Sequence, residues 1–511
     1  MEAPGQTRRS FLRTGLIAGG ALAFGPAFWR SALSAAPATP AAGPYGPLGP
    51  PDANGIALPQ GFSARAIAQG NQPVQGTAYV WHNFSDGAAT YGTEDGGWIL
   101  VSNSEVPSAP SVPASGGASA IRFNADGSIA DAYRILGGTR TNCAGGATPW
   151  GTWLSCEEVD DGQVWECDPR GQNPAVVHPA MGRFSHEAVA VDAGGRRVYL
   201  SEDEGESGFY RYTPSRWPDL SAGLLEIATV GRDGIVRWSL VPDPSAASAP
   251  TRQQVAGSTK FHRGEGIWFD NGIVYLATTS DSKIHAYDTA TETIEVLYDG
   301  DALQDPPLKM VDNITVSRSG DLFVCEDNSE QSYDIGIITP DRKVSRFLTI
   351  SGSQHTEGEL TGVIFDPSGT RMYVAQQRAF ATGVVYEITG PFRTDRRAAD
   401  RRRPGLTVKA PKAMSIELFR RRSLVAEVST DEPSAVTLEL KAKLGRKRVT
   451  LAKERRRASA VPRRVHVRGR RSAKRKLRGR RRVRAELQAV ARDAVGNRTT
   501  VKRKVELRSA R

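Results

Sequence analysis

The sequence predicts an all-β protein, a six-bladed β-propeller followed by a small Ig-like β-sandwich. Short, apolar, β-prone runs recur before residue 391, and most of them follow a turn rich in Gly, Asp or Ser. After residue 390 the composition changes and the chain becomes strongly basic. We therefore divide the chain into a leader (1–36), a propeller (37–390), a charged linker (391–404) and an Ig-like domain (405–511).

The propeller prediction rests on a repeated strand whose apolar stretch ends in polar or acidic residues. The six copies are WILVSNSE from Trp98, TWLSCEE from Thr152, RVYLSEDE from Arg197, IVYLATTSD from Ile273, DLFVCEDN from Asp321 and RMYVAQQ from Arg371. Most copies precede a second strand-like run, and period-2 strands repeating every several tens of residues are typical of propeller blades. Six copies predict six blades, although their uneven spacing also allows five or seven.

Charge separates the two predicted domains. Residues 391–511 carry 40 Lys and Arg against 11 Asp and Glu, a balance of +29, whereas the preceding residues carry 27 against 44, a balance of −17. In the tail, LTVKAP, SLVAEVST, AVTLELKA and ELQAVARDAVGNRTTVKRKVEL predict Ig-like strands. The most basic stretch, residues 463–484, has no Phe, Tyr or Trp on which bases could stack. Contact with anionic cell-envelope polymers, or a solvated surface, is therefore preferred over nucleic-acid binding.

The first residues predict export. TRRSFLR (7–13) is a twin-arginine motif, followed by a Gly- and Ala-rich apolar run and by small residues, SAAPA (34–38), that offer a cleavage site. The run is too short and too rich in glycine for a membrane anchor, and no other stretch is long and apolar enough to span a bilayer. We expect an extracellular or envelope-associated monomer without a transmembrane segment after signal cleavage.

Acidic residues follow the repeated strands. The innermost strands of a propeller run beside a central channel, so the polar ends of equivalent strands should converge at one mouth. The converging acids are Glu105, Glu157, Glu158, Glu202, Asp203, Asp281, Glu326 and Asp327. So many carboxylates repel one another unless cations neutralise them, and oxygen ligands in this number suit Ca²⁺ or Fe³⁺. The alternative is that they are solvated loop acids, which we expect for about half of them.

The cysteine pattern indicates which residue types could form a metal site. In an exported protein they could form two disulfides, and a structural role is favoured for Cys156, Cys167 and Cys325. The sequence contains no CxxC, HExxH or Walker pattern. Any metal site is therefore built mainly from carboxylates.

The segment NCAGGATPWGTWLSCEE (142–158) closely resembles the signature of PhoX-type alkaline phosphatases. Later motifs follow in the order of that family: GRFSHEAVAVD, VYLSEDEGESGFYRY, HRGEGIWFD, DNITVSRSGDLFVCED and TGVIFDPSGTRMYV. The resemblance covers residues from about 55 to 390, and the basic tail lies outside it.

The resemblance implies a six-bladed propeller that binds a pair of Fe³⁺ ions and Ca²⁺ ions at its channel and hydrolyses phosphate monoesters. By position, Cys143 matches an iron ligand, and Glu187 and Glu265 match the carboxylate iron ligands. Arg263 matches the arginine that binds the substrate phosphate. The residues that match calcium or bridging ligands, or are further calcium candidates, are Glu157, Glu158, Glu202, Asp203, Asp312 and Asn313.

The chemistry of these residue types is consistent with that activity. A thiolate could hold ferric iron where carboxylates alone would prefer calcium. Clustered cations polarise phosphoryl oxygens, and a guanidinium fork binds two of them at once.

Two other functions remain open. A calcium-dependent propeller lactonase or esterase would need neither Cys143 nor Arg263, and a non-catalytic envelope protein would need no intact ligand set. Metal content separates the three hypotheses: iron with calcium favours the phosphatase, calcium alone favours the lactonase, and neither favours the binding protein.

Overall fold

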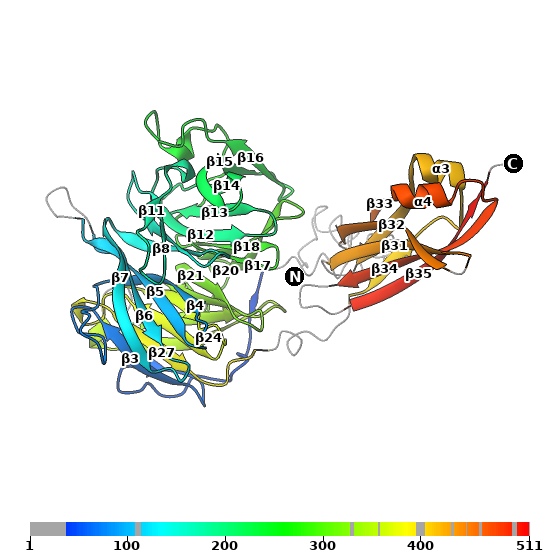
Figure 1. Cartoon of the computed structure of the whole chain (residues 1–511). Coiled ribbons are helices and arrows are strands. Elements are labelled where there is room, and N and C mark those ends of the chain that lie inside the picture. Colours follow the sequence, from blue (N-terminus) through cyan, green and yellow to red (C-terminus); the bar gives the residue numbers. More distant parts are fainter. Residues whose placement is uncertain are drawn as a thin grey trace, which may run out of the picture. The chain divides into compact units, whose positions relative to one another are not determined.

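The computed structural model describes residues 37–107, 114–327, 332–355, 358–394, 404–430, 434–445, 447–458, 462–492 and 498–509. The predicted leader (1–36) and most of the predicted linker (395–403) lie outside the described residues. The chain forms two compact units, one spanning Pro37–Arg396 and one containing the described residues from 404 onward. Nearly all regular structure in both units is β-strand (Figure 1).

The described residues of the first unit form six sheets, and most strands of a sheet follow one another along the chain. The first sheet comprises β4 (Ser85–Gly92), β5 (Trp98–Ser104), β6 (Gly116–Phe123) and β7 (Ile129–Thr139). The second comprises β8 (Asn142–Ala147), β9 (Trp153–Glu157), β10 (Val164–Cys167) and β11 (Val176–Val177). The third comprises β12 (His186–Asp192), β13 (Arg197–Glu202), β14 (Phe209–Arg216), β15 (Asp219–Val230) and β16 (Val236–Leu240).

The remaining three sheets continue this order. The fourth comprises β17 (Gly264–Asp270), β18 (Ile273–Thr278), β19 (Lys283–Asp288) and β20 (Thr293–Asp299). The fifth comprises β21 (Val311–Val316), β22 (Leu322–Glu326), β23 (Ser332–Ile338) and β24 (Lys343–Ser351), with β1 (Thr39–Pro40) and β2 (Ile56–Ala57) paired to β24. The sixth comprises β25 (Leu360–Phe365), β26 (Arg371–Gln376), β27 (Val384–Thr389) and β3 (Ser63–Gln69). Because β3 precedes the first sheet in sequence and β27 is the last strand of the unit, their pairing closes the sixth sheet with segments from both ends of the unit.

The six sheets are arranged as a ring. Their first strands, β4, β8, β12, β17, β21 and β25 (here the inner strands), contact one another in cyclic order, and β25 contacts β4. Five of the six apolar clusters in this unit take their buried residues from two consecutive sheets, including the sixth and the first, and the remaining cluster joins the third and fourth sheets with Cys143 and Ala144 of the second. For example, Leu154 and Cys156 of the second sheet pack with Leu200 and Tyr210 of the third. The core of this unit is therefore a series of six apolar interfaces between neighbouring sheets. The inner strands contact one another at the centre of the ring.

The repeated strands identified in the sequence are not these inner strands. The runs beginning at Trp98, Thr152 and Arg197 form β5, β9 and β13, each the second strand of its sheet. The expectation that these runs form the innermost strands is therefore wrong, because each run forms the strand next to the innermost one. The acids that follow them lie near the inner strands because each second strand pairs directly with an inner one.

The second unit contains two sheets with one shared core. One sheet comprises β28 (Leu406–Lys409), β30 (Ser423–Thr430) and β33 (Arg463–Arg468). The other comprises β29 (Ala413–Ser415), β35 (Arg498–Arg508), β34 (Arg482–Arg492), β31 (Ser434–Leu444) and β32 (Lys447–Ala458). Leu424 and Val467 of the first pack with Leu438 and Leu487 of the second.

Among the residues that the structure describes, helices are few and short. The second unit has α3 (Ile416–Arg421) and α4 (Arg471–Lys476), and the first has the 3₁₀ turns η1 (Pro179–Met181), η2 (Thr251–Gln253), η3 (Ser353–His355) and η4 (Ala379–Ala381). Within the described residues, none of the helices has the length and apolar character needed to cross a bilayer.

Candidate metal centre

A β-bulge lies at or near the beginning of every inner strand. The pairing register shifts between Ser85 and Ala88, Asn142 and Gly145, His186 and Val189, Gly264 and Ile267, Val311 and Ile314, and Thr361 and Ile364. The residues that open these bulges are Asp86, Cys143, Glu187, Glu265, Asp312 and Gly362. Bulges redirect side chains and are frequent beside active sites. Five of the six equivalent positions therefore carry a thiol or a carboxylate, and the sixth carries glycine.

Four of these residues form two groups with ligand atoms within 4.8 Å of one another. Cys143 and Glu187 group with Glu158, which follows β9, and Glu187 also groups with Glu265 and Asp312. Glu187 thus belongs to both groups, and it is 0% exposed. One thiol and three other carboxylates, from three other sheets, therefore lie around it.

Glu187 lacks hydrogen-bond partners. Among the described residues, no donor lies within hydrogen-bonding distance of either of its carboxylate oxygens. A buried carboxylate without donors or a counter-charge is costly, because burial removes its hydration without replacement. A bound cation would supply the missing counter-charge, so these residues fit a metal ion.

The raised pKa values in these two groups also favour a bound cation. Burial, followed by repulsion from Glu265 and Glu158, raises the pKa of Glu187 well above its usual range. The pKa of Glu265 is raised by burial and by Asp203, although Arg263 opposes the shift. Burial and the nearby acids also raise the pKa of the Cys143 thiol. Without cations these groups therefore favour their protonated forms.

A third group contains only carboxylates. Asp86, Glu105 and Glu359 also place ligand atoms within 4.8 Å of one another. The Gln377 amide donates hydrogen bonds to Asp86 Oδ2 (2.7 Å) and to Glu105 Oε2 (2.5 Å). Thr361 from the sixth bulge donates to Asp86 Oδ1 (2.5 Å). Burial, followed by repulsion from Asp86, raises the pKa of Glu105 to about 8.

Arg263 lies among carboxylates beside these groups. Its guanidinium donates two hydrogen bonds to Asp203 (3.0 Å and 2.9 Å), one to Glu265 (2.6 Å) and one to Asp327 (3.0 Å). Its side chain remains 33% exposed, and its φ of 55° is unusual for a residue with a Cβ. The structure thus holds a strongly basic, partly accessible guanidinium directly beside the metal-ligand candidates.

Several residues predicted from the sequence lie outside the three groups. Glu157 accepts hydrogen bonds from the backbone N–H groups of Arg140 (3.0 Å) and Gln163 (3.2 Å). Glu202 accepts from Gly208, Tyr210 and Arg252. Both carboxylates therefore already have donors.

Other predicted residues have local partners. Asp203 binds Arg263, and Asn313 donates to Asp312 (3.0 Å). Of the remaining strand-end acids, Asp281 pairs with Lys283, and Glu326 accepts from the backbone of Lys309 and Asp334. All four cysteines are buried free thiols, so the two disulfides that the sequence allowed are not formed.

Sequence reasoning missed Asp86, Glu359 and Gln377 as parts of the site. A signal for Asp86 exists in the local pattern around each bulge. The segments SDGA, NCAG, HEAV and GEGI each place a small residue directly after the residue with the functional group. We find no comparable signal for Glu359, which precedes β25 and reaches the group only through the tertiary fold.

The small residues after the ligands let the inner strands approach closely. A Cβ on Gly87 would lie 2.4 Å from Ala144 Cα, and one on Gly266 would lie 2.6 Å from the carbonyl oxygen of Asp312. Only glycine fits such contacts. Close strands bring the ligand atoms of neighbouring sheets within reach of one ion.

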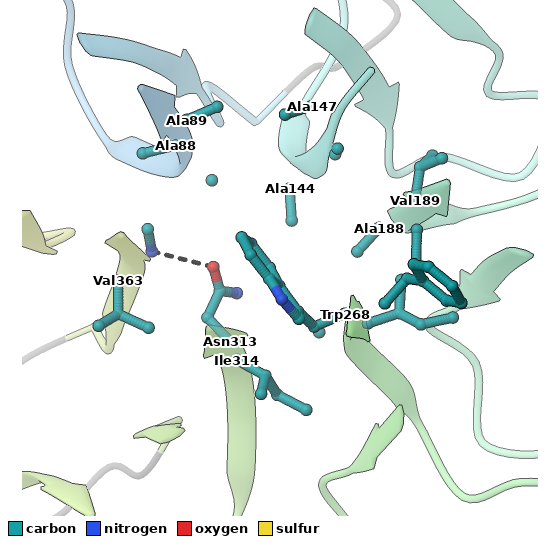
Figure 2. Close-up of a pocket in the computed structure, with 18 of the residues that line it drawn as sticks. Ala88, Ala89, Ala144, Ala147, Ala188, Val189, Trp268, Asn313, Ile314 and Val363 are labelled. Carbon is teal, nitrogen blue, oxygen red and sulfur yellow. Dashed lines mark hydrogen bonds between the residues drawn. The ribbon is translucent and has the colours of Figure 1, made fainter. Parts of the chain in front are cut away.

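Directly after the ligand residues the inner strands line a small pocket of about 130 Å³, bounded mainly by Gly, Ala and Val. Figure 2 shows the Trp268 indole lying across this pocket, between Asn313 and the strand that carries Ala144. Trp268 belongs to β17. Its side chain packs against two apolar clusters: the cluster between the fourth and fifth sheets and the cluster between the sixth and first sheets. The Asn313 side chain accepts a hydrogen bond from Gly362 N–H (2.9 Å; Figure 2). The metal-ligand candidates thus have an apolar floor.

Comparison with solved structures gives only weak similarities. A protein of unknown function from Bacteroides thetaiotaomicron is 10% identical, with a TM-score of 0.41, over 67% of this chain and 83% of that chain. Candidate 6-phosphogluconolactonases from Bacteroides uniformis and Bacteroides fragilis are 14% and 11% identical, with TM-scores of 0.34 and 0.33. They match 56% of this chain and 76% and 89% of theirs. Similarities this low carry no argument about activity.

Comparison by sequence is more informative. No curated protein matches the chain. The alkaline phosphatase PhoX family matches residues 94–168, 160–297 and 293–379, which together are more than half of the 511 residues. These ranges contain four of the five bulge ligands, together with Glu158 and Arg263. The chain belongs to the PhoX alkaline phosphatase family.

Proposed function

We propose that this protein is an exported, metal-dependent phosphatase that hydrolyses phosphate monoesters at an iron and calcium centre. The centre would lie where the six inner strands meet, and we interpret the ring of six sheets as a six-bladed β-propeller. Family membership supports the reaction class. The observation that carries the metal centre is Glu187, a fully buried carboxylate without a hydrogen-bond donor, shared by two groups of potential ligands.

The composition of each group suggests which ion it would hold. Cys143, Glu158 and Glu187 combine a thiolate with carboxylates, which suits Fe³⁺, and the group of Glu187, Glu265 and Asp312 would hold a second ion that shares Glu187. The all-carboxylate group around Asp86 suits Ca²⁺. Asp203, which contacts Arg263, and Asn313, which contacts Asp312, are further candidates for calcium contacts. We propose that Glu157 and Glu202 instead stabilise the surrounding loops.

The chain's own residues would bind and orient the ester. Cations bound here would polarise the phosphoryl oxygens and stabilise the negative charge that develops on them. Arg263 would donate to a non-bridging oxygen through the Nη1 N–H that Asp203, Glu265 and Asp327 leave unused, and a second, parallel contact would require the ester to displace one of these carboxylates. Trp268 and the apolar floor would keep water away from one side of the centre, so the ester would enter from the side of the partly exposed Arg263.

Elemental analysis of the mature protein, combined with turnover of p-nitrophenyl phosphate, tests this proposal. We expect iron and calcium together with turnover, and Glu187→Gln should lose iron and nearly all activity. Glu166→Gln is a matched control, because Glu166 is hydrogen-bonded to His178 and Trp150 outside the three groups. Calcium alone with lactone hydrolysis would instead identify a lactonase, and a metal-free inactive protein would identify a binding module.

We extend the proposal to the organisation of the whole chain. Residues 1–36 would be a twin-arginine signal peptide, 37–390 the catalytic propeller, 391–404 a linker and 405–511 an Ig-like domain. The basic tail would hold a monomeric enzyme at anionic polymers of the cell envelope. The net charge of +29 after residue 390 supports this role.

A further inference from the structure

One face of the larger sheet in the second unit is lined with basic side chains. Along β34 the core-facing residues Val483, Ala485 and Leu487 are buried, whereas Arg482 and Arg484 are exposed. A groove of about 1300 Å³ is lined by Val408, Lys409, Ala410, Lys412, Lys441, Ala442, Lys443, Arg448, Arg484, Ala485, Glu486, Lys502, Arg503, Lys504, Val505 and Glu506. A second hollow of about 310 Å³ is lined by Ala435, Thr437, Glu439, Lys441, Arg455, Gln488, Val490, Arg492 and Arg498. Lys441 lines both, so the two hollows adjoin and together form what we call the basic track.

Positive charge in the basic track is only partly neutralised, since Lys441 pairs with Glu439 while Arg448 and Lys502 share Glu486. Nine Lys and Arg side chains line the larger hollow against two glutamates. Lys443 lies directly opposite Arg448 across β31 and β32, and Arg492 lies directly opposite Arg498 across β34 and β35. Like charges at directly opposed positions destabilise a sheet. A bound anion would relieve this repulsion.

Some of these cations have no carboxylate partner. Lys443, Arg484 and Lys504 are exposed, and no ion pair joins any of them to an acid among the described residues of the unit. Arg484 offers the planar fork that fits phosphate, and Lys443 and Lys504 offer point charges on flexible stems. These three side chains are therefore free to contact a ligand.

The dimensions and chemistry of the track define the ligand. Strands β31, β34 and β35 each have 11 residues, which at about 3.4 Å per residue gives a path on the order of 35 Å. From residue 404 onward the sequence contains a single Phe, Tyr or Trp, namely Phe419, and its side chain is fully buried in the core. The track therefore offers length and cations but no surface on which bases could stack.

We propose that the basic track binds a linear phosphate polymer that lacks bases. The repeated charges of such a chain would lie along the strands and neutralise the opposed cations. This inference deepens the role proposed above for the tail and is independent of the metal centre. It is therefore tested by affinity rather than by turnover.

The experiment compares two triple variants of the full mature protein. The track variant carries Lys443→Gln, Arg484→Gln and Lys504→Gln. The control variant carries Arg471→Gln, Arg475→Gln and Lys476→Gln, which removes the same charge from exposed positions on α4. Binding of long-chain inorganic polyphosphate is measured over a series of salt concentrations, and thermal unfolding checks that both variants fold. The catalytic unit is identical in both variants, so its own contribution to binding cancels.

We expect the track variant to lose about 10-fold or more in polyphosphate affinity. The slope of log affinity against log salt should become shallower by roughly 2, as expected for three lost contacts to a single chain. The control variant should change less than about 3-fold. Equal losses in both variants would overturn the proposal, because net charge alone would then explain binding. Tighter binding of a polycarboxylate, or of single-stranded DNA of equal charge, would also overturn it.

Discussion

The Cys143 thiol and the Glu187 carboxylate lie within 4.8 Å of each other, although they come from the bulges of two different inner strands. Each opens the bulge of its strand, so the ring geometry alone brings a soft and a hard ligand together. Glu187 extends the contact to Glu265 and Asp312 from the next two sheets. The bulge, repeated sheet by sheet, is the element that builds the site.

Loss of the thiol should abolish the proposed iron site. Ferric iron bound to a thiolate absorbs visible light by charge transfer, so the mature protein should be coloured. Cys143→Ala should lose this colour and nearly all phosphatase activity. Cys167→Ala is the control, because Cys167 packs in the apolar cluster between the first and second sheets. An unchanged visible spectrum in Cys143→Ala would show that iron is held elsewhere or is absent.

The metal-free protein should become less stable as pH rises. The pKa of Glu105 lies at about 8 in the folded state against 4.5 without the fold, because burial and Asp86 disfavour its charged form. In this interval the folded state binds more protons than the unfolded state, so stability falls with pH. The loss should begin above about pH 4.5 and be complete above about pH 8, and Glu187, with its raised pKa, should add to it.

Thermal unfolding of chelator-treated protein across this pH range measures the effect. Adding calcium and iron should remove most of the pH dependence, because cations favour the charged carboxylates. Glu187→Gln removes a carboxyl that must take up a proton when the metal-free protein folds at high pH, and it should therefore stabilise that protein at pH 8 by about 1 kcal/mol or more, the equivalent of roughly one pKa unit. A metal-free protein whose melting temperature is constant from pH 5 to pH 8 would contradict this reasoning.

Replacing Arg263 should separate phosphate binding from metal binding. Arg263→Lys keeps a positive charge but loses the planar fork, so phosphate inhibition should weaken and kcat/KM should fall about 10-fold, or ~1.4 kcal/mol. Metal content should stay near that of the unmodified protein. Arg252→Lys is the control, because Arg252 pairs with Glu202 and Glu204 outside the ligand groups. Equal phosphate affinity in Arg263→Lys and the unmodified protein would exclude this role.

The Trp268 indole, which lines the apolar pocket beside the ligand candidates, should stabilise the fold and slow the loss of metal. Trp268→Ala leaves a cavity between two apolar clusters and should cost on the order of 3 kcal/mol of unfolding free energy. Opening the pocket beneath the ligands should also speed metal loss to a chelator, whereas Trp268→Phe should preserve most of the floor. Identical rates of metal loss in Trp268→Ala and the unmodified protein would show that the indole does not shield the centre.

Much of the site could be anticipated from the sequence. The residues Cys143, Glu187, Glu265 and Arg263 stand in long motifs, and the structure brings all four close together. The sequence could not show that Glu158 belongs to a group of potential ligands and that Glu157 does not. The two are adjacent, but successive residues point to opposite sides of an extended chain, and only the fold shows that Glu157 meets backbone donors.

By itself the sequence determined the all-β class, the repeat and the contrast between an acidic body and a basic tail, because strand periodicity, turn residues and charge are local properties. Only the tertiary structure decided which strand of each sheet is innermost. The repeated runs are prominent because they are apolar, yet they form the second strands. Four of the six inner strands (β4, β8, β12 and β17) carry two or more Gly or Ala residues, because the inner strands crowd together at the centre of the ring. The same crowding recruits Asp86 and Glu359, which lie far apart in the chain, into one group with Glu105. Such contacts depend on ring closure, which no local pattern encodes.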